Sequence, residues 1–182
     1  MNNQEENKIN PKILFLIIGL IITLFLGTIL FNEYTLNIGE KIYLKTVPVD
    51  PRDLLRGDYV VLRYEIQNHN EIRELIKKEE LTSGDNVYIS LNKDSEELGT
   101  FKLVTITKPN SGIFIKTKIT NKNSLELGIG KYFIPEGKGY QIERLRGNIK
   151  VLTSIDKFGN AKIIDLYKNN TKFEFNKSNK YN

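Results

Sequence analysis

Hydrophobic residues fill one long run near the start of the chain. Positions 13–31 carry no charged side chain, and only two glycines and two threonines interrupt the apolar residues. A helix over this run would be about 29 Å long, which matches a bilayer core of roughly 30 Å. The apolar run is longer than that of a signal peptide, and no A-x-A cleavage pattern follows it. The pattern therefore predicts an uncleaved transmembrane helix over residues 13–31.

Beyond this run the dominant hydrophobic period is two, which is typical of strands. Strands are predicted over Lys41–Val47, Tyr59–Ile66, Asn86–Leu91, Phe101–Thr107, Ile113–Ile119, Asn148–Ile155 and Ala161–Tyr167, with a short last strand over Lys172–Phe175. The turn Asn110-Ser111-Gly112 predicts that residues 113–119 pair antiparallel with residues 101–107. Residues 156–160 contain a glycine between two strands and predict a hairpin.

Two short helices are predicted between the strands. Asn70–Leu81 places apolar residues at helical spacing, and Ser83-Gly84 follows it as a stop signal. Gly139–Leu145 is a shorter candidate that is followed by Gly147. The predicted fold class is mainly β, a β-rich α+β fold. A single N-terminal transmembrane helix precedes an antiparallel β-domain with one or two short helices.

The charges beside the apolar run predict how the chain is placed in a membrane. Lys8 and Lys12 precede the run, whereas residues 32–40 contain no lysine or arginine. By the positive-inside rule the N-terminus stays in the cytoplasm. We therefore expect a short tail over 1–12, a signal-anchor over 13–31, an extracytoplasmic β-rich domain over 33–176 and a polar tail over 177–182. The expected location is the cell membrane.

Composition narrows the chemistry. The chain has 27 lysines and arginines against 22 acidic residues, and it contains no cysteine. Without cysteine there is no disulfide framework and no thiolate metal site. The scattered lysines read as a solvated surface, with attraction to anionic lipid headgroups or wall polymers as the alternative. Nucleic acid is not an expected partner outside the cell.

A short segment before the second predicted strand has the residues of a capped turn. Asp50 suits an N-cap, Pro51 suits the first helical position, and Asp53 favours exposed N–H groups of a first turn. Gly57 can adopt the left-handed conformation that ends such a turn. Asp58 would then accept from backbone N–H groups and fix the entry into the strand.

Alternation separates two faces of the strand that follows. The face predicted to lie in the core carries Val60, Leu62, Tyr64 and Ile66. The opposite face carries Tyr59, Val61, Arg63 and Glu65, and we expect it to be partly buried or to meet another surface. Arg52 and Arg56 lie four residues apart, and with Arg63 they are a candidate basic spot for a partner.

These residues resemble the bacterial GDYXXLXYXL-motif membrane proteins. The pattern is met by Gly57, Asp58, Tyr59, Leu62, Tyr64 and, in the final aliphatic place, Ile66. Asp50-Pro51-Arg52-Asp53-Leu54-Leu55-Arg56 and the later Tyr132-Phe133-Ile134-Pro135-Glu136-Gly137 are also similar to that family. The resemblance covers most of the chain. It implies a membrane-anchored protein that works beside a polytopic membrane protein, and it implies no activity.

The candidate site residues come from these two segments, in a structural or an interaction role. The first set is Asp50, Pro51, Arg52, Asp53, Leu54, Arg56, Gly57, Asp58, Tyr59, Leu62, Arg63, Tyr64 and Ile66. The second set is Tyr132, Pro135, Glu136 and Gly137.

A weaker local similarity concerns type I signal peptidases. Pro51-x-x-Leu54-x-x-Gly57-Asp58 is similar to the box around their nucleophilic serine. In this chain the place of that serine falls on Val49, which has no hydroxyl group. A Ser/Lys dyad needs a hydroxyl beside a lysine. The similarity therefore predicts a comparable turn and no peptidase site.

Other candidate catalytic groups are poorly placed. His69 is the only histidine, whereas a catalytic zinc normally needs three protein ligands. Glu79-Glu80 and Glu96-Glu97 lie in charged stretches and suit solvent better than a glycosidase pair. Pro135–Gly139 contains glycines and a lysine but lacks phosphate-loop spacing, although Glu136 and Lys138 could border a binding site. We expect no catalytic residue, metal or cofactor.

The sequence thus favours a non-enzymatic, single-pass anchored module that binds or stabilises another membrane or envelope component. The alternative is a hydrolase or peptidase-like envelope enzyme with an unrecognised site. An enzyme would show a concave pocket with converging polar groups near the motif. A binding module would show a packed turn with an exposed edge or aromatic patch.

Overall fold

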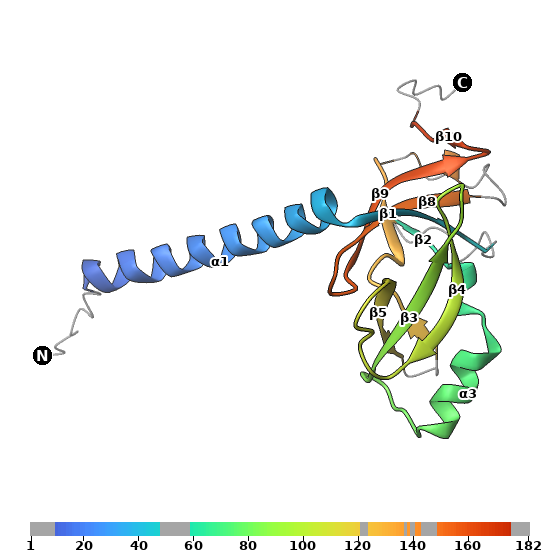
Figure 1. Ribbon diagram of the computed structural model, residues 1–182. Coiled ribbons are helices and arrows are strands. Elements are labelled where there is room, and N and C mark those ends of the chain that lie inside the picture. Colours follow the sequence, from blue (N-terminus) through green and yellow to red (C-terminus); the bar gives the residue numbers. More distant parts are fainter. Residues whose placement is uncertain are drawn as a thin grey trace, which may run out of the picture. The chain divides into compact units, whose positions relative to one another are not determined.

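The computed structural model describes residues 10–47, 59–120, 124–136, 138, 141–142 and 149–175. Contacts divide the chain between Tyr34 and Thr35 into an N-terminal unit and a folded unit. The helix α1 (Pro11–Ile38) contains the predicted span and extends beyond it at both ends (Figure 1). Asn10 caps it, because its side chain accepts the N–H of Lys12 at 3.0 Å. Within the described part of the chain, α1 is the one helix long and apolar enough to cross a membrane.

The folded unit is built on an eight-stranded sheet with the order β10-β9-β8-β1-β4-β3-β5-β6. Its strands are β1 (Glu40–Lys45), β3 (Asn86–Lys93), β4 (Leu98–Thr105), β5 (Ile113–Ile119), β6 (Leu125–Glu126), β8 (Ile149–Ile155), β9 (Ala161–Lys168) and β10 (Thr171–Lys172). Neighbouring strands are antiparallel except β1 and β4, which are parallel. The predicted fold class, a β-rich domain after an apolar helix, is confirmed.

The predicted pairing of residues 113–119 with residues 101–107 is wrong. Strand β5 pairs with β3, and β4 pairs with the opposite edge of β3. The reason lies in the lengths of the two connections. A four-residue turn joins β3 to β4 and makes them neighbours, whereas the seven residues 106–112 are enough to pass over β3 and cover roughly 10 Å between alternate strands.

The core lies on one face of the sheet. Its largest fully buried side chains include Ile42 and Leu44 of β1, Ile89 of β3 and Leu166 of β9. Gly99 of β4 lies opposite Leu44, and a Cβ atom there would come within 2.9 Å of the Leu44 side chain. The missing side chain at this position therefore lets β1 pack closely in the middle of the sheet.

Helix α3 (Asn70–Lys78) covers part of this core with Ile72 and Ile76. It ends three residues before the predicted boundary at Leu81. Glu80 adopts a left-handed φ of 50°, which breaks the helical backbone. The periodic apolar pattern continued past this point, so it overestimated the length of the helix.

The predicted hairpin over residues 156–160 is confirmed, because β8 and β9 are antiparallel neighbours on either side of it. The predicted last strand is shorter and earlier, as β10 covers Thr171–Lys172 only. Of the second predicted helix, Gly139–Leu145, residues 141–142 are helical and the others lie outside the described residues.

Candidate interaction surface

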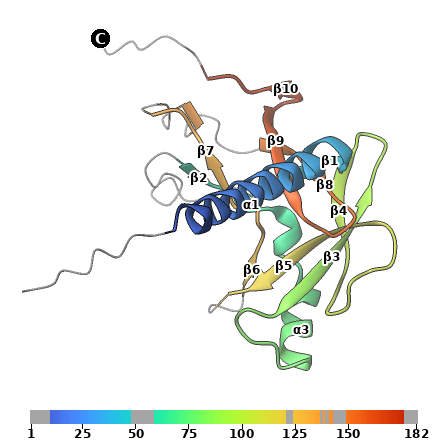
Figure 2. The same ribbon diagram turned by 90° about the vertical axis from the view of Figure 1, so that its left-hand side faces the viewer.

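Two sequence segments that resemble the same family come together as a two-stranded ribbon. Strand β2 (Tyr59–Val61) pairs antiparallel with β7 (Lys131–Phe133), and Figure 2 shows the two side by side. Tyr59 lies opposite Phe133, and Val61 lies opposite Lys131. The first and second motifs of the sequence therefore form one structural feature.

Backbone and side-chain bonds continue this link beyond the ribbon. The N–H of Leu62 donates to the carbonyl of Gly130 at 2.9 Å. The hydroxyl of Tyr64 donates to the carbonyl of Ile129 at 2.7 Å. Gln67 closes the motif, because its Oε1 accepts the N–H of Tyr64 and its Nε2 donates to the carbonyl of Leu125, both at 2.8 Å. The motif is thus fixed to the chain that leads into β7.

The predicted core face of the motif is confirmed. Its four side chains are almost inaccessible to solvent, with Val60 and Tyr64 at 0%, Ile66 at 2% and Leu62 at 5% exposure. The predicted strand over Tyr59–Ile66 is too long, however. Pairing with β7 stops at Val61, and a 3₁₀ helix, η1 (Glu65–Gln67), follows a single bridge between Thr46 and Tyr64.

The opposite face of the ribbon presents aromatic and basic side chains. Phe133 is 76% exposed, and its ring lies 6.1 Å from the ring of Tyr59 in an edge-on arrangement. Lys131 Nζ lies 5.4 Å from the centre of the Tyr59 ring, within the range of a cation–π contact. Arg63 is exposed farther along the motif. We refer to Tyr59, Lys131 and Phe133 as the ribbon patch.

Tyr132 lies between the patch residues but points to the other side of β7. It is half-buried and packs against the core. Burial raises the pKa of its phenol, the charge of Asp165 acts in the same direction, and Lys172 opposes the change. The side chain therefore stays a neutral phenol, and it packs between the ribbon and the core.

The remaining predicted site residues divide into two groups. Arg63, Pro135 and Glu136 are exposed, and Lys138 is half-buried. The capped turn, with Asp50, Pro51, Arg52, Asp53, Leu54, Arg56, Gly57 and Asp58, lies outside the described residues, and so does Gly137. The basic spot of three arginines is therefore represented by Arg63 alone.

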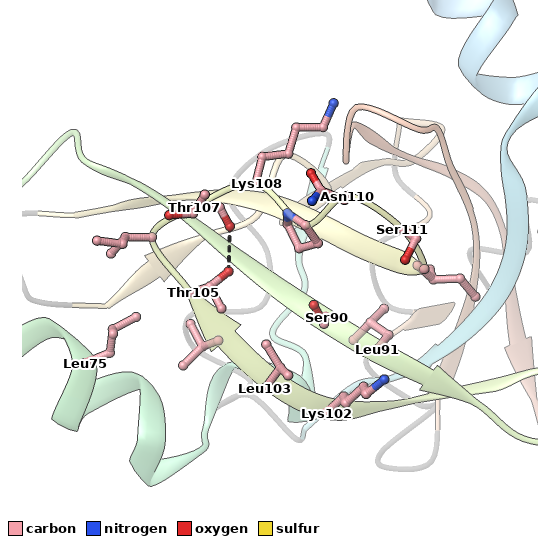
Figure 3. A pocket seen from close by; sticks show the side chains of 15 residues that line it. Leu75, Ser90, Leu91, Lys102, Leu103, Thr105, Thr107, Lys108, Asn110 and Ser111 are labelled. Atoms are coloured by element: carbon pink, nitrogen blue, oxygen red, sulfur yellow. Dashed lines mark hydrogen bonds between the residues drawn. The ribbon is translucent and has the colours of Figure 1, made fainter.

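A groove away from the ribbon lies beside the β4–β5 connection. It has a volume of about 630 Å³ and is lined by Leu75, by Ser90 and Leu91 and by residues 102–113 (Figure 3). Leu103 and Ile106 are 41% and 45% exposed there. Its side-chain hydroxyls include Thr105, which donates to the carbonyl of Thr107 at 2.7 Å. In Figure 3 the ammonium group of Lys108 points away from Ser90.

The other candidate groups have surface surroundings. His69 is the N-cap residue of α3, but its ring makes no capping bond and stacks on Phe101 at 4.0 Å. Glu79, Glu80, Glu96 and Glu97 are exposed. Among the residues that the structure describes, no three His, Cys, Asp or Glu side chains are grouped to hold a metal ion.

Sequence reasoning missed a buried polar junction at the start of the folded unit. Thr35 is fully buried, and its hydroxyl donates to the carboxylate of Asp156 at 2.9 Å. The carbonyl of Thr35 accepts the hydroxyl of Ser154 at 2.6 Å and the N–H of Gly39 at 3.2 Å. Thr35 is a short polar residue at the end of an apolar helix, which is a weak signal for a buried hydrogen bond. No local sequence pattern links it to Ser154 or Asp156, which lie more than a hundred positions later.

Asp156 also organises the turn between β8 and β9. Its carboxylate accepts the N–H of Phe158 at 2.8 Å, and the N–H and side-chain amide of Asn160, both at 2.9 Å. Burial alone would raise the pKa of this carboxyl. The hydrogen bonds from Asn160, Thr35 and Phe158 outweigh burial and hold the pKa below its ordinary value.

The turn is docked on the sheet by Gly159. Its φ of +85° is left-handed, and its carbonyl accepts the N–H of Lys116 in β5 at 2.8 Å. A Cβ atom at this position would come within 2.8 Å of the Phe114 ring. Only glycine meets both demands, so the position of the turn is fixed by its backbone.

Comparison with known proteins identifies the family to which the motif belongs. No curated protein and no solved structure matches the chain. The model of the family described as GDYXXLXY protein matches residues 21–166, which include both segments of the ribbon and the junction at Thr35 and Asp156. The chain belongs to the GDYXXLXY protein family.

Proposed function

We propose that the protein is a non-enzymatic, single-pass membrane module that docks on another membrane or envelope component through the ribbon patch. Helix α1 is the anchor, and the folded unit faces the outside of the cell. Support for the orientation comes from Lys8 and Lys12 before the apolar run and from the absence of basic residues over 32–40.

One observation carries the docking proposal, namely the exposure of Phe133. At 76% it is the most exposed of the large hydrophobic side chains described in the folded unit. Hydrogen bonds from Leu62 and Tyr64 to the segment before β7 hold the ribbon in place. The Phe133 ring is therefore carried by an ordered strand. Exposed aromatic residues on ordered strands are typical of interfaces, where they supply contact area at a low entropic cost.

Charge and aromatic content describe the partner surface. Lys131 and Arg63 add positive charge beside Tyr59 and Phe133. A complementary partner offers an apolar recess for the Phe133 ring and acidic groups around it. The proposal concerns binding and assigns no reaction to the patch.

Site-specific photo-crosslinking in living cells tests this proposal. A photoreactive phenylalanine analogue at position 133 should give a discrete crosslinked product in the membrane fraction. The same analogue at Leu103, which is exposed on β4, is the matched control. Charge reversal by Lys131→Glu should reduce the product from position 133 severalfold. Equal products from both positions, or a product indifferent to K131E, would contradict docking through the ribbon patch.

A further inference from the structure

We propose that the turn between β8 and β9 binds anionic phospholipid headgroups of the membrane in which the protein is anchored. The contact residues are Lys157 and Phe158 of the turn and the neighbouring Lys108, which together we call the turn patch. This inference rests on the proposed membrane anchoring of α1.

The covalent chain sets the distance between the turn and the membrane. Phe31 ends the apolar run and precedes Thr35 by four residues, or about 6 Å along a helix. Thr35 is bonded at 2.9 Å to Asp156, and Lys157 and Phe158 are the next two residues. This connection therefore keeps the turn within reach of the headgroup region.

The turn patch has the chemistry of a membrane interface. Phe158 is 45% exposed. Lys108 Nζ lies 5.0 Å and Lys157 Nζ lies 5.2 Å from the centre of its ring. Aromatic rings enter the interfacial layer, and lysines beside them are attracted by anionic headgroups. The pairing of one ring with two ammonium groups fits that layer better than it fits bulk water.

Two acidic groups beside the turn, Asp156 and Glu40, are already engaged. Asp156 accepts four hydrogen bonds within the turn and from Thr35. Glu40 lies opposite Ile155, and its carboxylate forms a 2.7 Å ion pair with Lys93. Lys41 and Lys162 flank the same strand in register with Ser154. The local balance is positive, which complements an anionic lipid surface.

The turn is also ordered before any lipid contact. Asp156 holds its backbone from within, and Gly159 fixes it to β5 through the bond to Lys116. A preformed contact loses little conformational entropy on binding. The exposure of Phe158 is thus a property of a fixed loop and not of a frayed end.

The chain contains no tryptophan, so Phe158→Trp introduces a single fluorescent reporter. The full-length variant is reconstituted into phosphatidylcholine vesicles with and without phosphatidylglycerol, and part of the lipid carries brominated acyl chains. We expect emission at shorter wavelength and strong quenching by brominated lipid when phosphatidylglycerol is present. Ser83→Trp, in the exposed turn after α3, is the matched reporter and should stay unquenched.

The lysines are tested in the F158W background. Lys108→Gln with Lys157→Gln should remove most of the dependence on phosphatidylglycerol. Lys77→Gln with Lys78→Gln, an equal loss of charge on exposed residues of α3, should not. Circular dichroism confirms that each variant is folded. An unquenched F158W reporter, or quenching indifferent to both phosphatidylglycerol and the lysines, would overturn the inference.

Flotation of the wild-type protein with the vesicles separates this result from the anchoring proposal. Protein that floats but leaves the F158W reporter unquenched refutes the turn patch alone. Protein that does not float at all, even after reconstitution, refutes the anchor and the turn patch together.

Discussion

The hydroxyl of Tyr64 donates a 2.7 Å hydrogen bond to the backbone carbonyl of Ile129. Tyr64 is fully buried, and burial raises the pKa of its phenol above the ordinary value of 10.0. Burial therefore keeps the phenol protonated, and it can donate this bond. This bond fixes the family motif to the chain segment that leads into β7, and it supports the ribbon patch from the inside.

Removing that hydroxyl should be costly. Tyr64→Phe leaves the Ile129 carbonyl buried without its donor, and we expect a loss of about 1–3 kcal/mol in the free energy of unfolding. Leu62→Ala removes packing without a polar partner and should cost about 2–5 kcal/mol. Chemical denaturation of the full chain in mild detergent measures both. An unchanged midpoint for Y64F would show that the hydrogen bond contributes nothing net.

Arg63 provides the opposite case within the same motif. Its side chain is exposed, and the bond that its residue makes, from the N–H of Val47 to the Arg63 carbonyl at 2.9 Å, uses the backbone only. Arg63→Ala keeps this bond and should change stability by less than about 1 kcal/mol. The same denaturation experiment compares it with L62A. A loss as large as that of L62A would mean that the guanidinium group is structural.

Asp156 should make stability depend on pH. Its folded-state pKa lies below the ordinary value of 3.8. The ionised carboxylate therefore adds to the free energy of unfolding above pH 3.8, and this stabilisation is lost as the pH falls through the folded-state pKa. Asp156→Asn cannot reproduce the charge and should melt at a lower temperature than wild type near neutral pH. The gap between the two melting temperatures should narrow below about pH 4. A constant gap over this range would exclude the ionised carboxylate as its source.

Gly39 has no room for a side chain. A Cβ atom there would overlap the Ser154 hydroxyl and lie 2.5 Å from the Thr35 carbonyl oxygen. Gly39→Ala should therefore disturb the junction and cost about 1–3 kcal/mol through overpacking. The control is Gly128→Ala, because no heavy atom lies within 4 Å of a Cβ atom at that position. Equal thermal stability of the two variants would contradict the close approach at Gly39.

Protease accessibility tests the orientation of the anchor. In intact spheroplasts we expect external protease to digest the folded unit, because the basic residues closest to the apolar run precede it. A tag at the N-terminus should stay protected until the membrane is opened. Protection of the folded unit under the same conditions would reverse the assignment.

Local alternation predicted burial better than it predicted pairing. Val60, Leu62, Tyr64 and Ile66 are buried as their spacing indicates, although only three residues of the predicted strand pair with β7. Side-chain direction in an extended chain is set by the backbone of that segment alone. The contact of Tyr59 with Phe133 depends on segments far apart in the sequence, and single-sequence periodicity contains no information about it.

The same limit explains the missed junction and the misplaced strand. Asp156 was predicted as part of a hairpin, which local glycine and turn residues indicate, but its bond to Thr35 was not. Strand β5 was placed beside its sequence neighbour β4, whereas the sheet puts β3 between them. Phe133 lies in the second motif segment. Its exposure depends on the pairing of β7 with β2, which the sequence did not predict.

The central place of β1 has a consequence for the time course of folding. Strand β1 is the first strand to be synthesised, yet it pairs over six register positions with β8, at residues 149–155. Ribosomes add about 5–20 residues each second, so β1 waits roughly 5–20 s for β8. The sheet can close only when nearly the whole chain has been made. Until then the edge of β1 that pairs with β8 remains without its neighbour.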